Sequence, residues 1–147
     1  MTIEKLINPS EEDLEQIAEL MTQLRGKDLS AEDIRTDVEA IVKSSVKAIM
    51  VAREDDNEIV GVLVVNILMK LAKREARIDE FVVDSNVRGG GLGKKIIGAA
   101  LDWAWSKDCN TVELTSRPSR VAANHLYQKL GFALRKTNVY VLRNDLK

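Results

Sequence analysis

The chain of 147 residues has the length of one ordinary domain, and a chain of this size buries roughly 68–70% of its unfolded surface. Its 22 basic and 23 acidic residues nearly cancel, so no net charge indicates a nucleic-acid partner. A single cysteine excludes an internal disulfide, and one cysteine with one histidine argues against a zinc site. We find no leader segment and no apolar run of about 18 residues. We therefore expect a cytoplasmic protein without a metal, nucleic-acid or membrane partner.

The first part of the chain predicts a short strand followed by two helices. Residues 2–7 are compatible with the strand. Two serines are each followed three residues later by an aspartate, which is the spacing of an N-terminal capping box, and apolar residues follow each box at helical spacing. We expect Gly26 to end the first helix. The residues of the two boxes are Ser10, Asp13, Ser30 and Asp33.

The rest of the chain alternates strands with helices. Residues 47–53 and 58–69 read as two strands joined by the turn Asp55-Asp56-Asn57, and residues 77–83 as a third. A helix of about four turns follows the glycines after residue 88. Residues 111–115 then predict a strand, 118–130 a helix ending at Gly131, and 138–142 a last strand. With no linker or repeat, residues 1–147 read as one mixed α/β domain.

The stretch VVDSNVRGGGLGKKI, residues 82–96, is the most informative part of the sequence. Glycines at a strand-to-helix turn let a ligand approach the backbone, and the first amides of the helix bind anions, above all phosphate. Arg88, Lys94 and Lys95 add positive charge there. A flexible connection is the alternative. A P-loop is excluded because Arg88 stands where its first glycine belongs, and a dinucleotide fingerprint because Lys94 stands in its last position.

The pattern Arg88-x-x-Gly91-x-Gly93, placed after a strand and opening a helix, resembles the acyl-CoA pyrophosphate signature of the GNAT superfamily of N-acetyltransferases. Phe81-x-Val83 resembles the strand that leads into that loop. Asn124-x-x-Tyr127-x-x-x-Gly131-Phe132 resembles the family's second conserved region. The resemblance covers roughly residues 59–142. It implies a single GNAT-like α/β (α+β) domain, with a central mixed, mostly antiparallel sheet flanked by helices.

The resemblance also implies that acetyl-CoA is the co-substrate and that no metal takes part. Amides of residues 89–94 would then hold the pyrophosphate, and backbone groups of residues 81–83 would pair with the pantetheine arm like an added strand. A backbone N–H near Val82 or Val83 would polarise the thioester carbonyl. The predicted acetyl-CoA-binding residues are Phe81, Val82, Val83, Arg88, Gly89, Gly90, Gly91, Leu92, Gly93, Lys94 and Asn124.

Three side chains are candidates for proton transfer. An acceptor amine with a pKa near about 10.4 is mostly protonated at neutral pH, so a base is useful. Asp79 and Glu80 precede the glycine turn, and because neighbours on a strand alternate faces, we expect one of the two to point toward the acceptor. The resemblance favours Asp79, while two solvated strand residues are the alternative.

Tyr127 occupies the position that in many GNAT enzymes protonates the leaving thiolate. Proton transfer from a phenol to a thiolate is uphill by about 2 kcal/mol in water, so hydrogen bonding to the sulfur is one alternative role. A place in the core is the other. Asn124, three residues earlier, is expected to share its helical face.

The predicted function is acetyl transfer from acetyl-CoA to a primary amine, of a small molecule first, by direct attack in a ternary complex. A protein N-terminus or lysine is the alternative acceptor, and an acyl-CoA-binding sensor the alternative of another class. Lys70, Lys73 and Arg74 indicate either an anionic acceptor or, preferably, a solvated turn. The sequence is compatible with a homodimer. It leaves open the acceptor's identity and whether a longer acyl group is transferred.

The remaining reactive or aromatic side chains are expected to have structural roles. His125 neighbours Asn124 on the predicted helix, and we expect it at the surface. Cys109 has no basic neighbour in sequence, so a buried thiol is expected. Trp103 and Trp105 are expected to pack against the sheet, since no basic residues interleave with them as on a nucleic-acid platform.

Overall fold

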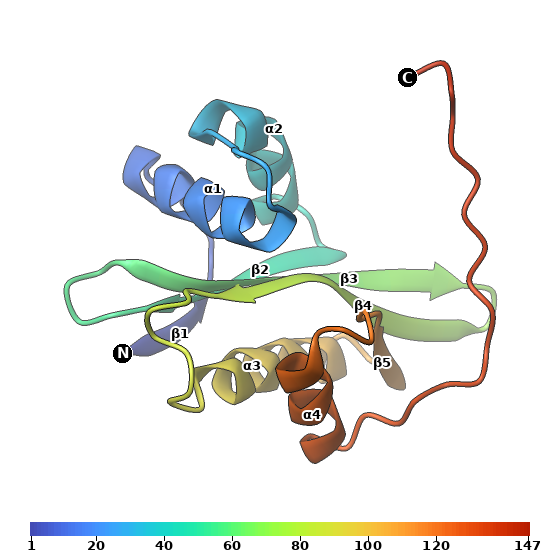
Figure 1. The fold of residues 1–147 in the computed structure, drawn as a ribbon. Coiled ribbons are helices and arrows are strands. Elements are labelled where there is room, and N and C mark those ends of the chain that lie inside the picture. Colours follow the sequence, from blue (N-terminus) through green and yellow to red (C-terminus); the bar gives the residue numbers. More distant parts are fainter.

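The computed structural model describes residues 1–147 and contains five strands and four helices (Figure 1). The strands are β1 (Thr2–Lys5), β2 (Lys47–Arg53), β3 (Ile59–Lys70), β4 (Lys73–Val83) and β5 (Thr111–Leu114). The helices are α1 (Glu11–Arg25), α2 (Ala31–Val42), α3 (Leu92–Ser106) and α4 (Val121–Lys129).

The strands form one sheet in the order β1-β2-β3-β4-β5. The first three pairings are antiparallel, and β4 and β5 are parallel. The parallel pair arises because α3 carries the chain back across the sheet before β5 begins, as a parallel connection requires. The predicted mixed, mostly antiparallel sheet is therefore confirmed.

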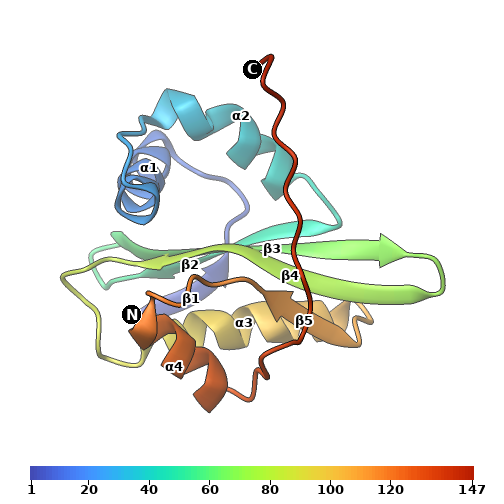
Figure 2. The same cartoon turned by 45° about the vertical axis from the view of Figure 1, so that its right-hand side comes forward.

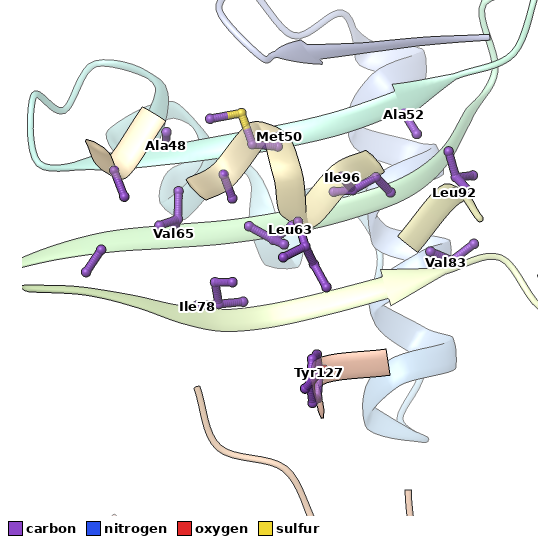
Figure 3. Close-up of a cluster of buried hydrophobic side chains, with 14 of the residues drawn as sticks. Ala48, Met50, Ala52, Leu63, Val65, Ile78, Val83, Leu92, Ile96 and Tyr127 are labelled. Carbon is purple, nitrogen blue, oxygen red and sulfur yellow. The ribbon is translucent and has the colours of Figure 1, made fainter. Parts of the chain in front are cut away.

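Helices cover both faces of the sheet, and each face has its own hydrophobic cluster. Helices α1 and α2 lie on one face, and α3 and α4 on the other (Figures 1 and 2). The α1/α2 cluster includes Leu20 and Val62, while the α3/α4 cluster, drawn in Figure 3, includes Leu63 and Ile96. A Cβ atom on Gly61 would lie 2.5 Å from the Ile96 side chain, so glycine lets α3 approach β3 closely.

The two predicted capping boxes are both present. The Ser10 hydroxyl accepts from the backbone N–H of Asp13, and the Asp13 carboxylate accepts from the N–H of Ser10. Ser30 and Asp33 form the same pair at the start of α2. Gly26 ends α1 in the left-handed conformation, at φ 66°, as expected. In each helix the capping serine thus satisfies one of the free amides of the first turn, that of the third residue.

Glu75 lies at the start of the β4–β5 pairing with only 2% of its side chain exposed. Hydrogen bonds from Lys70 and then Lys73, on the two sides of the β3–β4 turn, lower the pKa of Glu75 to about 2. The lysines therefore form a turn anchored on a buried carboxylate. Of the two alternatives for Lys70 and Lys73, an anion site and a solvated turn, these contacts favour the turn.

Replacing Glu75 with glutamine is expected to change how stability depends on pH. Since the folded-state pKa lies below the usual 4.5, the ionised group stabilises the fold above about pH 4.5, and this contribution is lost as the pH falls toward 2. Glu75→Gln should lower the free energy of unfolding at pH 7, and the gap to wild type should close at low pH. Urea unfolding at pH 7, 4 and 2.5 measures this. The control is Glu58→Gln at an exposed site, and an unchanged gap at all three pH values would contradict the expectation.

The predicted strand at residues 138–142 is wrong. Residues 138–142 join no sheet, because they make no backbone hydrogen bond to β5 or to any other strand. Helix α4 also begins at Val121, three residues later than expected, and β4 begins at Lys73, four residues earlier.

None of the four helices is long and apolar enough to cross a membrane.

Candidate active site

The second half of β4 has an open edge. Residues 75–78 of β4 pair with residues 111–114 of β5, and no strand lies beside β4 beyond Ile78 on that side. Residues 79–83 keep β3 as their only neighbour. Their backbone groups on the β5 side have no strand beside them, which leaves room for the extended ligand expected at residues 81–83.

A β-bulge at Asp79 changes the expected alternation of side chains. Ile78 pairs with Val65 and Glu80 with Val64, so one residue on β4, Asp79, has no counterpart on β3. Ile78 packs in the α3/α4 cluster, and Glu80 forms an ion pair with Arg25 of α1 on the opposite face.

The contacts of Asp79 place it on the same face as Glu80. Its carboxylate accepts a hydrogen bond from the Asn66 amide and a second one, of 2.6 Å, from Arg77 Nε. Asn66 and Arg77 are cross-strand partners whose strand neighbours Val65, Ala76 and Ile78 all pack in the α3/α4 cluster. Both acids therefore face α1 and α2. The alternation expected of neighbouring strand positions does not hold here, because Asp79 is itself the extra residue of the bulge.

The glycine turn leaves the start of α3 without a cap. Gly91 is the N-cap residue at φ 77°, and no side chain bonds to the first amides of the helix. Gly89 is also left-handed, at φ 97°. A Cβ atom placed on Gly89, Gly90 or Gly91 would meet no atom within 4 Å, so the space above the turn is open. Unlike α1 and α2, this helix presents free N–H groups to an anion.

Positive side chains surround this helix start. Lys94 and Lys95 lie exposed in the first turn of α3, which carries no acidic residue. Arg88 donates from Nε to the carbonyl oxygen of Val83 over 3.0 Å, so its guanidinium is held at the end of β4. The charge of all three therefore adds to that of the free amides, which favours a ligand with several negative charges.

Tyr127 comes from α4 and is buried in the α3/α4 cluster. Its ring belongs to the α3/α4 cluster with Ile78 and Val83, where Figure 3 shows it, and its edge meets Phe132 at a centroid distance of 6.1 Å. Its hydroxyl makes no hydrogen bond within the chain. Burial raises the pKa of Tyr127, and the charge of Arg120 opposes this only in part. The phenol therefore keeps its proton at neutral pH.

Asn124 holds the turn that precedes α4. Its amide donates to the carbonyl oxygens of Arg117, over 2.9 Å, and Arg120, over 2.8 Å. Two other candidates also have local roles. Leu92 is buried in the α3/α4 cluster. Gly93 is closely packed, since a Cβ there would lie 3.2 Å from the Phe81 ring and 3.1 Å from Leu126. These contacts join α3, α4 and β4 around the open edge.

The side chains predicted to have structural roles largely do. His125 is exposed, and Cys109 is buried, with burial raising the pKa of its thiol. Trp103 packs against the α3/α4 cluster, whereas Trp105 is 47% exposed. The expectation that both tryptophans pack is therefore confirmed for Trp103 alone.

Three side chains that contact the acids were missed by the sequence reasoning. Arg25 reaches Glu80 from α1, and no local pattern could have connected residues so distant in sequence. Arg77 and Asn66 approach Asp79 across the β3–β4 pair. Asn66 carried a signal, since it is the one polar residue among the apolar ones of β3 from Ile59 to Met69. A polar residue in such a strand needs a partner, and here the partner is Asp79.

A hollow of the surface lies elsewhere. It has a volume of about 630 Å³ and runs between α1 and α2, where Glu15, Glu19 and Asp28 are among its lining residues. The open edge of β4, Tyr127 and the glycine turn do not line it. We assign the candidate site to the edge of β4 because the free amides and the acid pair lie there.

The family model described as the acetyltransferase (GNAT) family matches residues 14–132, well over half of the chain. The chain belongs to the GNAT acetyltransferase family, as its two motifs predicted. None of the curated proteins compared matches it.

Solved structures with the same fold are numerous. A transcriptional regulator from Bacillus halodurans C-125 is 25% identical, with a TM-score of 0.82 over 97% of this chain and 99% of that chain. The aminoglycoside acetyltransferase meta-AAC0020 from an uncultured soil metagenomic sample, solved with trehalose, is 24% identical, with a TM-score of 0.80 over 97% and 95%. The aminoglycoside N-acetyltransferase AAC(6')-Iy, solved with CoA, is 19% identical, with a TM-score of 0.81 over 97% and 93%. The last two likenesses show the fold alone.

Proposed function

We propose that residues 1–147 act as one N-acetyltransferase domain that transfers an acetyl group from acetyl-CoA to a primary amine of a small molecule. The observation that carries this is the uncapped start of α3, which lies at the end of the open edge of β4, on which Tyr127 also packs. Acetyl-CoA supplies an acyl thioester that an amine can attack directly. The likeness in fold to an acetyltransferase solved with CoA supports this donor.

The donor side of the site fits acetyl-CoA in shape and in charge. Free amides at Gly91 and after it, with Lys94 and Lys95 beside them, suit a diphosphate. The unpaired backbone of residues 79–83 suits the amide-containing pantetheine arm, which would add to β4 as a strand does. Open space above Gly89, Gly90 and Gly91 gives the phosphates access. Each feature serves a different part of the same molecule.

The acceptor side is defined by the two carboxylates on the α1/α2 face. Asp79 and Glu80 each accept from an arginine, Arg77 and Arg25, so both carboxylates are held in a fixed orientation. A carboxylate in this position attracts an ammonium group and accepts its proton, directly or through water. A small-molecule amine is the acceptor class that we infer, a proposal supported by the aminoglycoside enzymes among the structural neighbours.

Tyr127 serves the leaving sulfur. Its hydroxyl makes no competing hydrogen bond and is protonated at neutral pH. Because burial raises the pKa of Tyr127, complete transfer of its proton to a thiolate is further uphill than in water. We infer that the phenol stabilises the departing thiolate through a hydrogen bond, and that the proton finally comes from solvent.

The test is release of free thiol from acetyl-CoA with a panel of amines, together with a binding titration of acetyl-CoA. We expect acetyl-CoA binding and amine-dependent thiol release, fastest with small polyamines. Release only with peptides carrying a free N-terminus or lysine would assign a protein acceptor instead. Tight binding without release for any acceptor would favour an acyl-CoA sensor, and absence of binding would contradict both.

Asn66 is expected to act through Asp79. Asn66 is 7% exposed, and its amide donates a hydrogen bond to the Asp79 carboxylate. Asn66→Ala removes this bond and leaves that carboxylate less well oriented. We expect kcat to fall about tenfold, as for Asp79→Asn, with unchanged affinity for acetyl-CoA, because Glu80 still offers a carboxylate on the same face.

A double-mutant cycle distinguishes this role from a general loss of packing. If Asn66 works only by holding Asp79, the double variant Asn66→Ala/Asp79→Asn has the kcat of Asp79→Asn alone. Losses that multiply in the double variant would show that the two residues act independently. Far-UV circular dichroism and the unfolding midpoint of each variant serve as controls for folding.

A further inference from the structure

Arg120 is the N-cap residue of α4, and it lies on the helix face that carries Tyr127. Residues spaced by four and then by three positions share one face of a helix, so Arg120, Asn124 and Tyr127 form one row along α4. The carbonyl oxygen of Arg120 accepts from the Asn124 side-chain amide over 2.8 Å and from the Asn124 backbone N–H over 3.0 Å. The side chain of Arg120 therefore starts from a fixed point of this row.

The guanidinium of Arg120 has no partner in the chain. It takes part in no ion pair and donates no side-chain hydrogen bond, although the residue is exposed. Arg25, Arg77 and Arg135, by contrast, are each paired with an acid. The positive charge of Arg120 is therefore not balanced by any acid of the fold.

The surroundings of Tyr127 within the core are otherwise apolar. The α3/α4 cluster that holds its ring includes Ile78 and Val83 of β4, with Leu114 of β5 packed against it. Burial raises the pKa of Tyr127, and the charge that opposes this rise is that of Arg120. Arg120 thus supplies positive potential at a hydroxyl that apolar side chains otherwise surround.

The other charged side chains of the elements around Tyr127 act elsewhere. Asp79 and Glu80 of β4 lie on the opposite face of the sheet, each bonded to an arginine. Glu113 of β5 is paired with Arg135. Arg88 is bonded at the end of β4, beside the glycine turn. The remaining ones on α3 and α4 are exposed, namely Lys94, Lys95, Asp102, His125 and Lys129.

We propose that Arg120 stabilises the thiolate that leaves acetyl-CoA, an inference that rests on the proposed function. The amine nitrogen bonds to the acetyl carbon and gives up its proton to a carboxylate or to water. The carbon–sulfur bond then breaks, its electron pair passes to sulfur, and the thiolate finally takes a proton from solvent. Tyr127 donates a hydrogen bond to that sulfur, and Arg120 supplies the opposite charge that the apolar cluster lacks.

The expected effect follows from how a positive charge acts on a thiol. A thiol has a pKa of about 8.5 in water, and apolar surroundings disfavour its ionised form. An opposite charge nearby shifts this equilibrium about tenfold or more toward the ionised form. CoA bound beside Arg120 should therefore ionise at a lower pH than free CoA, and a thiolate should leave more readily.

Isothermal titration with CoA and with desulfo-CoA, which lacks the sulfur, tests the proposal between pH 6.5 and pH 9.5. The ratio of the two affinities reports on the thiol alone, because the phosphate contacts are shared. CoA should gain affinity over desulfo-CoA as the pH rises toward the ordinary pKa of the thiol. We expect this gain to be about tenfold smaller in Arg120→Gln and to be restored in Arg120→Lys, which keeps the charge.

Arg117→Gln is the matched control, because it removes a positive charge from the same turn and should retain the gain. Equal gains in the wild type and in Arg120→Gln would overturn the proposal. A loss of affinity of the same size for CoA and desulfo-CoA at every pH would also overturn it, since Arg120 would then act on the phosphates. Failure of the wild-type chain to bind CoA would contradict the proposed function itself, and this inference with it.

Ionisation of Tyr127 provides a second measurement, which needs no ligand. The chain has two tyrosines, so Tyr140→Phe leaves Tyr127 as the only phenol. In that background, tyrosinate absorbance should appear at a higher pH in Arg120→Gln than with Arg120 present, while circular dichroism reports whether the fold is retained. An identical titration of the two folded proteins would show that the charge does not act at this hydroxyl, and would overturn the proposal whatever the chain acetylates.

Discussion

Replacing Gly91 with valine is expected to lower the affinity for acetyl-CoA by at least about 10²-fold. Gly91 caps α3 in the left-handed conformation, and the space above it is open. A valine side chain would occupy the space through which a phosphate approaches the free amides. It would also cost about 1–3 kcal/mol of backbone strain, because a β-branched residue avoids positive φ.

Gly26→Val is a matched control for this strain. Gly26 ends α1 at φ 66°, close to the 77° of Gly91, and a Cβ there also meets no atom within 4 Å. Both variants should therefore lose a similar part of their free energy of unfolding, and only Gly91→Val should lose acetyl-CoA, as measured by isothermal titration. Normal binding by a folded Gly91→Val protein would remove the glycine turn from the donor site.

Replacing Tyr127 with phenylalanine is expected to lower kcat by about 10²-fold with acetyl-CoA affinity nearly unchanged. The ring keeps its place in the α3/α4 cluster, since the variant removes only a hydroxyl that makes no hydrogen bond within the chain. What is lost is the hydrogen bond offered to the leaving sulfur, and removing one preorganised donor to a developing anion typically costs about 10²–10³ in kcat.

The pH profile provides a second measurement of the same role. Burial raises the pKa of Tyr127 above its usual value near 10, so the phenol is protonated from pH 7 to pH 9. The ratio of wild-type to Tyr127→Phe turnover should therefore be constant over that range. Tyr140→Phe, at an exposed tyrosine in the chain after α4, is the control and should have wild-type turnover. An unchanged kcat in Tyr127→Phe would leave the residue a packing role only.

Much of the fold could be predicted from the sequence because the signals are local. A capping box needs two side chains three residues apart, and both boxes are present where Ser10 and Ser30 predict them. Strand β2 begins and ends at the predicted residues. The spacing of the apolar residues changes from that of a helix to that of a strand where β2 begins, and a turn follows where it ends. The glycine turn is equally local: the helix that follows it starts at Leu92, directly after the three glycines.

The parts that could not be predicted depend on contacts between distant segments. The bulge at Asp79 is a mismatch between β4 and β3, and neither strand reveals it alone. The pairing of Glu80 with Arg25 depends on how α1 lies across the sheet. Residues 138–142 have the local pattern of a strand, and whether they form one is decided by the edges within reach.

The division of the core by the sheet has a consequence for how the proposed activity can diverge. The proposed donor side, with the glycine turn, Leu92 and Tyr127, stands on the α3/α4 cluster, whereas Asp79 and Glu80, the proposed acceptor side, face the α1/α2 cluster. Substitutions that repack α1 and α2 can therefore reshape acceptor recognition while the donor site stays intact. Such a molecule can acquire a new acceptor by small steps, each of which retains a working acetyl donor.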